Sequence, residues 1–265
     1  MSLVTGDFYS EAIGMYTEFT AILPEESITK NNKGKKYPTL YLLHGGLHDH
    51  TSMIRDTKLY KIISEKFPEL VVIMPNCDFS FFTDYHGDYK YAYKFKTFIC
   101  DELIEITRAL FPLSHKREDT AIYGWSMGGF GAMTAGLNHP ETYGYVGTQC
   151  GMVNMPWAVA TRDFLKVKHS IMFGKNLKVK GTEYDFFYLI DQMINSDGVK
   201  PAIFHSRTEE DYLGKINEEF YEYCKELRMD YTTIKTLGIH GWGLHDAGLI
   251  GFIEWLSGRM KEEVK

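Results

Sequence analysis

Short, continuous apolar runs recur along the chain and alternate with segments of helical periodicity. "PTLYLLH" (38–44) and "LVVIMP" (70–75) contain almost no polar positions, which is typical of strands buried on both faces of a parallel sheet. Further candidate strands are residues 120–125, 143–150, 201–206 and 231–237. Residues 17–24 instead alternate polar and apolar side chains, and this pattern predicts an antiparallel edge strand.

Apolar side chains at spacings of three and four predict helices between these strands. The helical stretches are residues 91–111, 214–228 and about 247–260. Strands that alternate with helices predict βαβ crossovers, and therefore an α/β fold whose mainly parallel sheet is covered by helices on both faces.

Residues 152–200 interrupt this alternation, because they are rich in Met, Phe and Tyr but contain no clear strand. We interpret them as a short helical insertion above the sheet and not as a second domain. Residues 1–265 are therefore expected to form a single domain.

Composition and charge narrow the classes of function. Hydrophobic residues make up 44% and charged residues 24% of the chain, as in ordinary globular proteins. The formal charge is −6, and the sequence shows no cluster of basic residues. Both features argue against a nucleic-acid partner. No apolar run approaches the roughly 20 residues of a membrane-spanning helix, so no membrane partner is expected.

The cysteines and the N-terminal sequence indicate the cellular compartment in which the protein is expected to work. Cys77, Cys100, Cys150 and Cys224 are widely separated and form no CxxC motif, which favours reduced thiols over a disulfide framework or a zinc site. The first residues, "MSLVTGDFYSEAIG", show no signal-peptide pattern. Both features predict a cytoplasmic enzyme.

The segment "TAIYGWSMGGFGAM" (120–133) carries the most informative motif. Residues 124–128 match GxSxG, with an apolar strand before the motif and a helix rich in small residues after it. A sharp strand-to-helix turn presents a serine hydroxyl at the carboxyl edge of a sheet, and glycines leave room for its strained backbone. Ser126 is therefore the expected nucleophile.

A serine nucleophile needs a base, and the base needs an acid that orients it. In folds with this motif the chain order is Ser, Asp or Glu, and then His. His240 follows the last candidate strand in a glycine-flanked loop and is the expected base, whereas His245 would begin a helix or line the pocket wall. The acid is expected after strand 201–206, where the sequence offers Glu209, Glu210 and Asp211.

Several stretches distributed nearly end to end carry a family resemblance. They are "FYSEAIGM", "YPTLYLLHGG", "VVIMPNCDFSFFTD", "DELIEITRALFPLSHKREDTAIYGWSMGGFGAM", "EEDYL" and "GIHGW". In them the chain resembles the tributyrin-esterase and feruloyl-esterase (esterase D-like) branch of the α/β-hydrolases, which is related to the carbohydrate esterases and S-formylglutathione hydrolases. The resemblance implies the α/β-hydrolase fold.

The resemblance also assigns roles to individual residues. It makes Ser126 the nucleophile and His240 the base, and it favours Asp211 as the acid because an aromatic-aliphatic pair follows the acid in these esterases. Glu210 remains the alternative acid, and Asp211 could instead cap the helix that begins near residue 214. The chain departs from the family at two positions, with Thr208 in place of a glycine and His245 in place of a second aromatic residue.

The stretch "YLLHGGLHDHT" (41–51) has two readings. It lies after an early strand, where this fold places a backbone donor for the oxyanion of the tetrahedral intermediate, so the N–H groups of Gly46 and Met127 are expected to form the oxyanion hole. The alternative is a metal site made of His48, Asp49 and His50, although their spacing matches no common zinc motif.

The sequence therefore predicts a serine carboxylesterase that hydrolyses short acyl or aryl esters, including acetylated or feruloylated sugars, without a cofactor. Leu47, Trp125 and Trp242 are the expected substrate contacts. Aromatic residues of the insertion, with Trp125 and Trp242, are expected to leave a short acyl slot: Trp157, Phe164, Phe173, Phe186, Phe187 and Tyr188. The alternative functions are a thioesterase of the S-formylglutathione hydrolase type, whose Ser-Gly-Leu-Thr pattern is missing here, and a metal-dependent hydrolase. A homo-oligomer would fit the resemblance.

Overall fold

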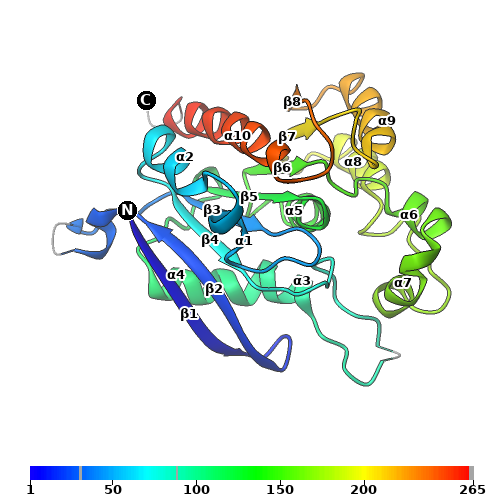
Figure 1. Cartoon of the computed structure of the whole chain (residues 1–265), viewed down its shortest axis with the longest axis horizontal. Helices are drawn as coiled ribbons and strands as arrows, with labels where there is room; N and C mark the ends of the chain where they lie inside the picture. Colours follow the sequence, from blue (N-terminus) through cyan, green and yellow to red (C-terminus); the bar gives the residue numbers. More distant parts are fainter. Residues whose placement is uncertain (30–31, 88, 263–265) are drawn as a thin grey trace.

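One mixed sheet organises the chain, as the computed structural model shows (Figure 1). The structure describes residues 1–29, 32–87 and 89–262, without the side chains of residues 242–245 and 262. Within these residues the sheet has eight strands in the order β1-β2-β4-β3-β5-β6-β7-β8. The strands are β1 (Ser2–Ser10), β2 (Met15–Leu23), β3 (Thr39–Leu43), β4 (Val71–Pro75), β5 (Thr120–Trp125), β6 (Tyr145–Gln149), β7 (Ala202–Arg207) and β8 (Tyr231–Lys235).

The strands expected from continuous apolar runs all belong to the parallel part of the sheet. β3 pairs in parallel with β4 and β5, and the parallel pairing continues through β6 and β7 to β8. Residues of β3, β4, β5, β6 and β7 are buried throughout, because helices cover both faces of this region. The predicted α/β-hydrolase fold is confirmed.

The edge of the sheet differs from the expectation. All but the last of residues 17–24 fall within β2, which is antiparallel to β4 as expected, but β1 lies outside β2 and forms the edge. Gly14 turns the chain with φ 65°, so that residues 2–10 pair with β2 along their whole length. β1 alternates half-buried and exposed positions, as expected for a strand with one face in solvent.

Helices form a layer on each face of the sheet (Figure 1). One core lies between the sheet and α4, α5, α8 and α9, and the other lies under α1, α2 and α10. The α-helices are α1 (Ser52–Asp56), α2 (Leu59–Lys66), α3 (Phe95–Thr97), α4 (Leu103–Leu110), α5 (Met127–Asn138), α6 (Met155–Thr161), α7 (Lys166–Phe173), α8 (Phe186–Ile194), α9 (Gly214–Lys225) and α10 (Trp242–Glu262). Shorter turns of 3-10 helix are η1 (Glu25–Ile28), η4 (Arg117–Asp119) and η5 (Asp163–Leu165), and η3 (Phe98–Glu102) is a π-helical turn.

Two helix starts differ from the sequence expectation. The helix expected from residue 91 begins at Phe95, because Tyr93 accepts a backbone hydrogen bond from Tyr85 at 2.8 Å and holds the preceding residues in a loop. The last helix begins at residue 242 and not near 247. Asp246 accepts a hydrogen bond from the backbone N–H of Lys58 at 2.9 Å, which ties the start of this helix to α2.

Residues 152–200 form short helices joined by turns, as predicted. α6 and α7 lie beyond α5 at one side of the sheet, and α8 packs against α5 (Figure 1). None of the described helices has both the length and the apolar character needed to span a bilayer.

The sheet topology determines where chemistry can occur. The loops that follow β3, β5, β7 and β8 all leave the carboxyl edge of the sheet, because these strands are parallel. In open α/β sheets this edge is where ligands bind. Each candidate catalytic residue lies on one of these loops.

Candidate active site

Ser126 stands at the turn between β5 and α5. Its backbone has φ 55° and ψ −114°, a left-handed conformation that costs free energy for a non-glycine residue and is concentrated at functional sites. The Ser126 N–H donates to the Gln149 carbonyl at 3.0 Å. A Cβ on Gly124 would lie 2.1 Å from the Gly128 carbonyl oxygen, and one on Gly128 would lie 2.3 Å from the Leu43 oxygen. The motif needs glycines at these two positions because the backbones of β5, α5 and β3 come into contact there.

Three predicted residues form one hydrogen-bonded chain. The Ser126 hydroxyl lies 2.9 Å from His240 Nε2, and His240 Nδ1 lies 2.5 Å from Asp211 Oδ2. The Asp211 side chain is fully buried and that of His240 is 12% exposed. The His240 ring also contacts the rings of Trp125 and Tyr212, with centroids 4.9 Å and 4.5 Å away. These contacts restrict the imidazole orientation.

The two oxygens of the Asp211 carboxylate have different partners, one in a local turn and the other in the His240 ring. Its Oδ1 accepts from the Leu213 N–H at 2.6 Å, while Oδ2 remains for the imidazole. It does not cap α9, whose N-cap position is Leu213. Thr208, which replaces the family's glycine, donates its hydroxyl hydrogen bond to the Gly238 carbonyl at 3.1 Å. The threonine therefore ties the Asp211 loop to the loop that carries His240.

The other two acidic candidates have different partners. Glu210 Oε2 accepts from the Gly238 N–H at 2.9 Å, and Glu209 forms an ion pair with Lys235 at the surface. Gly238 has φ 119°, a conformation that favours glycine. Glu210 therefore stabilises the backbone of the His240 loop and does not contact the imidazole in this structure.

A cavity of about 240 Å³ opens beside Ser126 and His240. Its walls are mostly apolar, and they include the predicted residues Gly46, Leu47, Trp125 and Met127. The other lining residues are Phe79, Phe81, Met152, Arg162, Phe164, Leu165 and Tyr212.

The loop after β3 brings Gly46 next to Met127. A Cβ placed on Gly46 would lie 4.0 Å from the Met127 Cβ, in ordinary contact, but only 2.8 Å from the Phe79 ring. Glycine at this position therefore avoids a clash with Phe79 and leaves the backbone beside Met127. The next residue, Leu47, has φ 63° and its side chain is 86% exposed at the pocket. Leu47 combines an exposed apolar side chain with a strained backbone.

Buried His44 fixes the start of this loop. The Nδ1–H donates to the Gly45 carbonyl at 2.8 Å, and Nε2 accepts from the Cys77 N–H at 3.1 Å. Burial lowers the pKa of His44 to about 4, so the ring is neutral at neutral pH. This histidine was not identified as functional from the sequence, although it directly precedes the double glycine.

The three residues of the alternative metal reading do not converge. The His48 ring stacks on Trp125 with centroids 5.3 Å apart. Asp49 Oδ1 accepts from the Thr51 N–H at 2.7 Å and from Arg55, and His50 contacts the Thr20 hydroxyl at 2.7 Å and the Glu18 carboxylate at 3.1 Å. In the part of the chain that the structure describes, no group of three His, Cys, Asp or Glu side chains could hold a metal ion.

The aromatic residues of the insertion mostly pack elsewhere. Of the six expected to shape the acyl slot, only Phe164 lines the cavity. Phe173 and Phe186 are buried in the core, and Phe187 packs on Phe220 with a centroid distance of 5.5 Å. The prediction that all six form the slot is wrong, because α8 turns Phe186 and Phe187 toward α5 and α9 and α7 buries Phe173 in the core. The side chains of Trp242 and His245 lie outside the described residues.

The sequence reasoning missed the two polar side chains of the pocket wall, Tyr212 and Arg162, as well as several apolar ones. The Tyr212 hydroxyl lies 3.4 Å from His240 Nε2, and the Arg162 guanidinium stands 5.3 Å from the Tyr212 ring centroid. Tyr212 directly follows Asp211, which is the signal that could have placed it in the site. Arg162 is a cation within an aromatic insertion, and only the fold brings it to the pocket.

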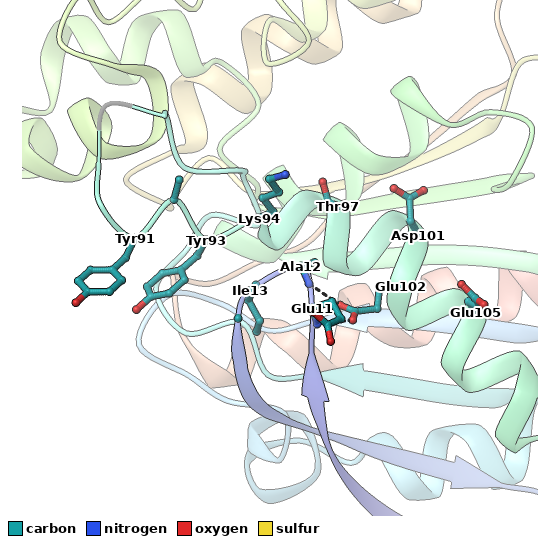
Figure 2. A pocket seen from close by; sticks show the side chains of 12 residues that line it. Glu11, Ala12, Ile13, Tyr91, Tyr93, Lys94, Thr97, Asp101, Glu102 and Glu105 are labelled. Carbon is teal, nitrogen blue, oxygen red and sulfur yellow. Dashed lines mark hydrogen bonds between the residues drawn. The ribbon is translucent and has the colours of Figure 1, made fainter.

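A larger cavity lies away from this constellation. It has a volume of about 770 Å³ between the β1–β2 turn and residues 91–105 (Figure 2). Glu102 points to the β1–β2 turn, where it accepts hydrogen bonds from the Ser10 hydroxyl and from the Glu11 N–H at 2.7 Å. This cavity contains neither Ser126 nor His240, so the smaller cavity is the candidate active site.

Buried histidines predict a stability that depends on pH. His205 donates from Nε2 to Asn217 at 2.8 Å and accepts from the Tyr231 hydroxyl at 2.6 Å, and burial lowers its pKa to about 4, as for His44. Between pH 4 and about 6.5 the unfolded chain binds more protons than the folded one, so the free energy of unfolding falls as the pH falls. From pH 7 to pH 5 we expect a loss of roughly 2 kcal/mol per histidine.

Urea unfolding at pH 7 and pH 5 measures this loss. His205→Gln is expected to be less stable at both pH values but to show a smaller difference between them, because one titrating group is gone. Equal free energies of unfolding of the unmodified protein at the two pH values would contradict the prediction.

Comparison with known proteins matches most of the chain to one family. Residues 10–249 match the esterase family model described as "Putative esterase". An acetyl esterase of Caldicellulosiruptor saccharolyticus is 26% identical over 267 residues, covering 97% of this chain and 98% of that protein.

Solved structures of hydrolases are also similar to this chain over nearly its whole length. The fluorophosphonate-binding serine hydrolase FphF of Staphylococcus aureus is 28% identical, with a TM-score of 0.86 over 97% of this chain and 98% of that chain. An S-formylglutathione hydrolase of the same organism has equal identity and coverage, with a TM-score of 0.83. The names of these relatives all describe hydrolases or esterases, and they differ in the substrate or ligand that they mention.

Proposed function

The chain belongs to the esterase family, and we propose that this serine carboxylic ester hydrolase cleaves short-chain acyl and aryl esters through an acyl-enzyme on Ser126. The observation that carries the proposal is the hydrogen-bonded chain from Ser126 through His240 to buried Asp211, at the mouth of a small apolar cavity.

Attack on the ester begins when His240 Nε2 takes the proton of the Ser126 hydroxyl. The Ser126 oxygen then bonds to the carbonyl carbon, and the carbonyl oxygen gains a negative charge. Asp211 holds the imidazole in place and stabilises the imidazolium. The Met127 and Gly46 N–H groups, whose residues lie side by side at the cavity, would donate hydrogen bonds to the oxyanion.

The intermediate collapses when the bond to the alcohol oxygen breaks and His240 returns its proton to the leaving alcohol. Water then attacks the acyl-enzyme by the same steps in reverse and releases the acid and free Ser126. None of these steps requires a metal ion or an organic cofactor.

The cavity dimensions support a short acyl group. Its volume of about 240 Å³ lies below the range of roughly 300–1,000 Å³ that is typical of drug-sized ligands. Phe79, Phe81 and Leu165 line it with apolar groups, while the exposed side of Leu47 leaves room for a larger alcohol half, such as a sugar. We also propose a cytoplasmic location, because all four cysteines are free and buried, as in proteins of reducing compartments.

A chain-length series tests the size of the acyl slot. With p-nitrophenyl esters from C2 to C12, we expect kcat/KM to be highest for acetyl to butyryl and to fall for octanoyl and longer groups, because a cavity of this volume is too small for them. A steady rise in kcat/KM through C12 would overturn the short-chain proposal.

The thioesterase alternative needs a separate comparison. S-formylglutathione and p-nitrophenyl acetate are assayed with the same enzyme preparation, and we expect the oxygen ester to be the better substrate by kcat/KM. A kcat/KM for the thioester more than tenfold above that of the acetate would make the protein a thioesterase of the S-formylglutathione hydrolase type.

A further inference from the structure

Arg162 places a positive charge in the wall of the catalytic cavity. It follows α6 in the insertion, and its N–H closes that helix on the Ala158 carbonyl at 2.9 Å. The guanidinium packs against two aromatic rings, 4.7 Å from the Trp157 centroid and 5.3 Å from the Tyr212 centroid. These contacts orient the charged group toward the cavity that contains Ser126.

The guanidinium has few hydrogen-bond partners within the chain. Its Nη2 contacts the Tyr212 carbonyl at 3.4 Å, and its Nε is buried without a hydrogen-bond partner among the described residues. No carboxylate in the described part of the chain forms an ion pair with it, whereas Arg207 and Arg259 pair with Glu218 and Asp230. Most buried polar groups in proteins have a hydrogen-bond partner, so the unpartnered Nε beside the cavity leaves a donor that a ligand can use.

Arg162 also stands near the reacting atoms. The Tyr212 ring contacts the guanidinium, and the Tyr212 hydroxyl lies 3.4 Å from His240 Nε2, the atom that contacts Ser126. One tyrosine side chain therefore separates the positive charge from the nucleophile. A substrate with its ester carbonyl at Ser126 could place an anionic group a few bonds away against Arg162.

We propose that Arg162 forms an anion subsite and that the preferred substrates are esters that carry a carboxylate. The inference rests on the proposed ester hydrolysis and adds the substrate class. The planar guanidinium binds a carboxylate through two parallel hydrogen bonds, and the remaining cavity wall is apolar, with Phe79, Phe81 and Met152 offering the anion no competing partner.

Matched pairs of esters test the subsite. One pair places the charge in the alcohol half, 4-acetoxybenzoate against 4-acetoxyacetophenone. The other places it in the acyl half, monoethyl succinate against ethyl levulinate. In each pair a methyl ketone replaces the carboxylate at nearly the same size, and the measured quantity is the ratio of kcat/KM for the anionic ester to that for the neutral ester.

Arg162→Gln is expected to lower this ratio roughly tenfold or more for one pair, as the loss of charge-assisted hydrogen bonds does. Arg162→Lys is expected to lower the ratio less, because lysine keeps the positive charge but lacks the two parallel N–H donors of the guanidinium. The pair that responds identifies which half of the substrate carries the carboxylate. Lys166→Gln is the control: this exposed lysine lies outside the cavity, and its removal should change the ratio by less than about twofold.

A ratio that stays within about twofold of the unmodified protein in Arg162→Gln, for both pairs, would overturn the inference alone. An equal drop for Lys166→Gln would also overturn it, because the effect would then come from net charge and not from a subsite. Failure of the unmodified protein to hydrolyse any of the four esters would overturn the proposed function together with the subsite.

Discussion

Ser126→Ala is expected to lower kcat for p-nitrophenyl acetate by about 10⁴–10⁶ with the fold intact, as removal of the nucleophile does in enzymes with this machinery. The alanine keeps the strained backbone turn and removes only the oxygen that lies 2.9 Å from His240 Nε2. Steady-state kinetics measure the loss, and circular dichroism checks the fold. An alkyl fluorophosphonate should label the unmodified protein once and should not label the variant.

Ser206→Ala is the matched control for this variant. Ser206 is also buried near the carboxyl edge of the sheet, and its hydroxyl has no hydrogen-bond partner among the described residues. We expect its kcat to stay within about threefold of the unmodified protein. If Ser126→Ala kept more than about a tenth of the original kcat, Ser126 could not be the nucleophile.

Asp211→Asn is expected to lower kcat by about 10²–10⁴. The asparagine oxygen can still accept from the Leu213 N–H, as Asp211 Oδ1 does, so the turn before α9 should survive. The neutral amide cannot stabilise an imidazolium at His240, and its NH₂ group can force the ring into the wrong tautomer. The expected signature is therefore a loss of kcat without a comparable loss of thermal stability.

Glu210→Gln distinguishes the two neighbouring acids. Glu210 Oε2 accepts from the Gly238 N–H, and the glutamine oxygen can keep that hydrogen bond. We expect kcat within about threefold of the unmodified protein, measured under the same conditions as Asp211→Asn. Near-normal activity in Asp211→Asn together with a collapse in Glu210→Gln would show that Glu210 is the catalytic acid.

The order of strands and helices could be predicted because it depends on local patterns. Runs such as 70–75 are apolar on both faces. Both faces are buried when the run forms a strand that helices cover on each side. β1 was missed because an edge strand with one face in solvent has a weak pattern, and its pairing with β2 depends on the turn at Gly14. Strand boundaries were close to the prediction, while two helix starts shifted: α3 begins later, where a loop hydrogen bond holds Tyr93, and α10 begins earlier.

Sequence patterns alone predicted a mainly parallel α/β sheet, the GxSxG turn at Ser126 and the candidate base His240, because each depends on residues a few positions apart or on chain order. The α/β-hydrolase class and the preference for Asp211 came from the family resemblance. Only the tertiary structure decided which carboxylate contacts His240, because Glu209, Glu210 and Asp211 are consecutive and the turn points their side chains in different directions.

The tertiary structure also decided the composition of the pocket. Arg162 and Tyr212 are 50 positions apart and meet through backbone and ring contacts, and most aromatic residues of the insertion turn away into the core. Such contacts depend on how separate layers pack against each other, and packing between distant segments leaves no periodic signal in the chain.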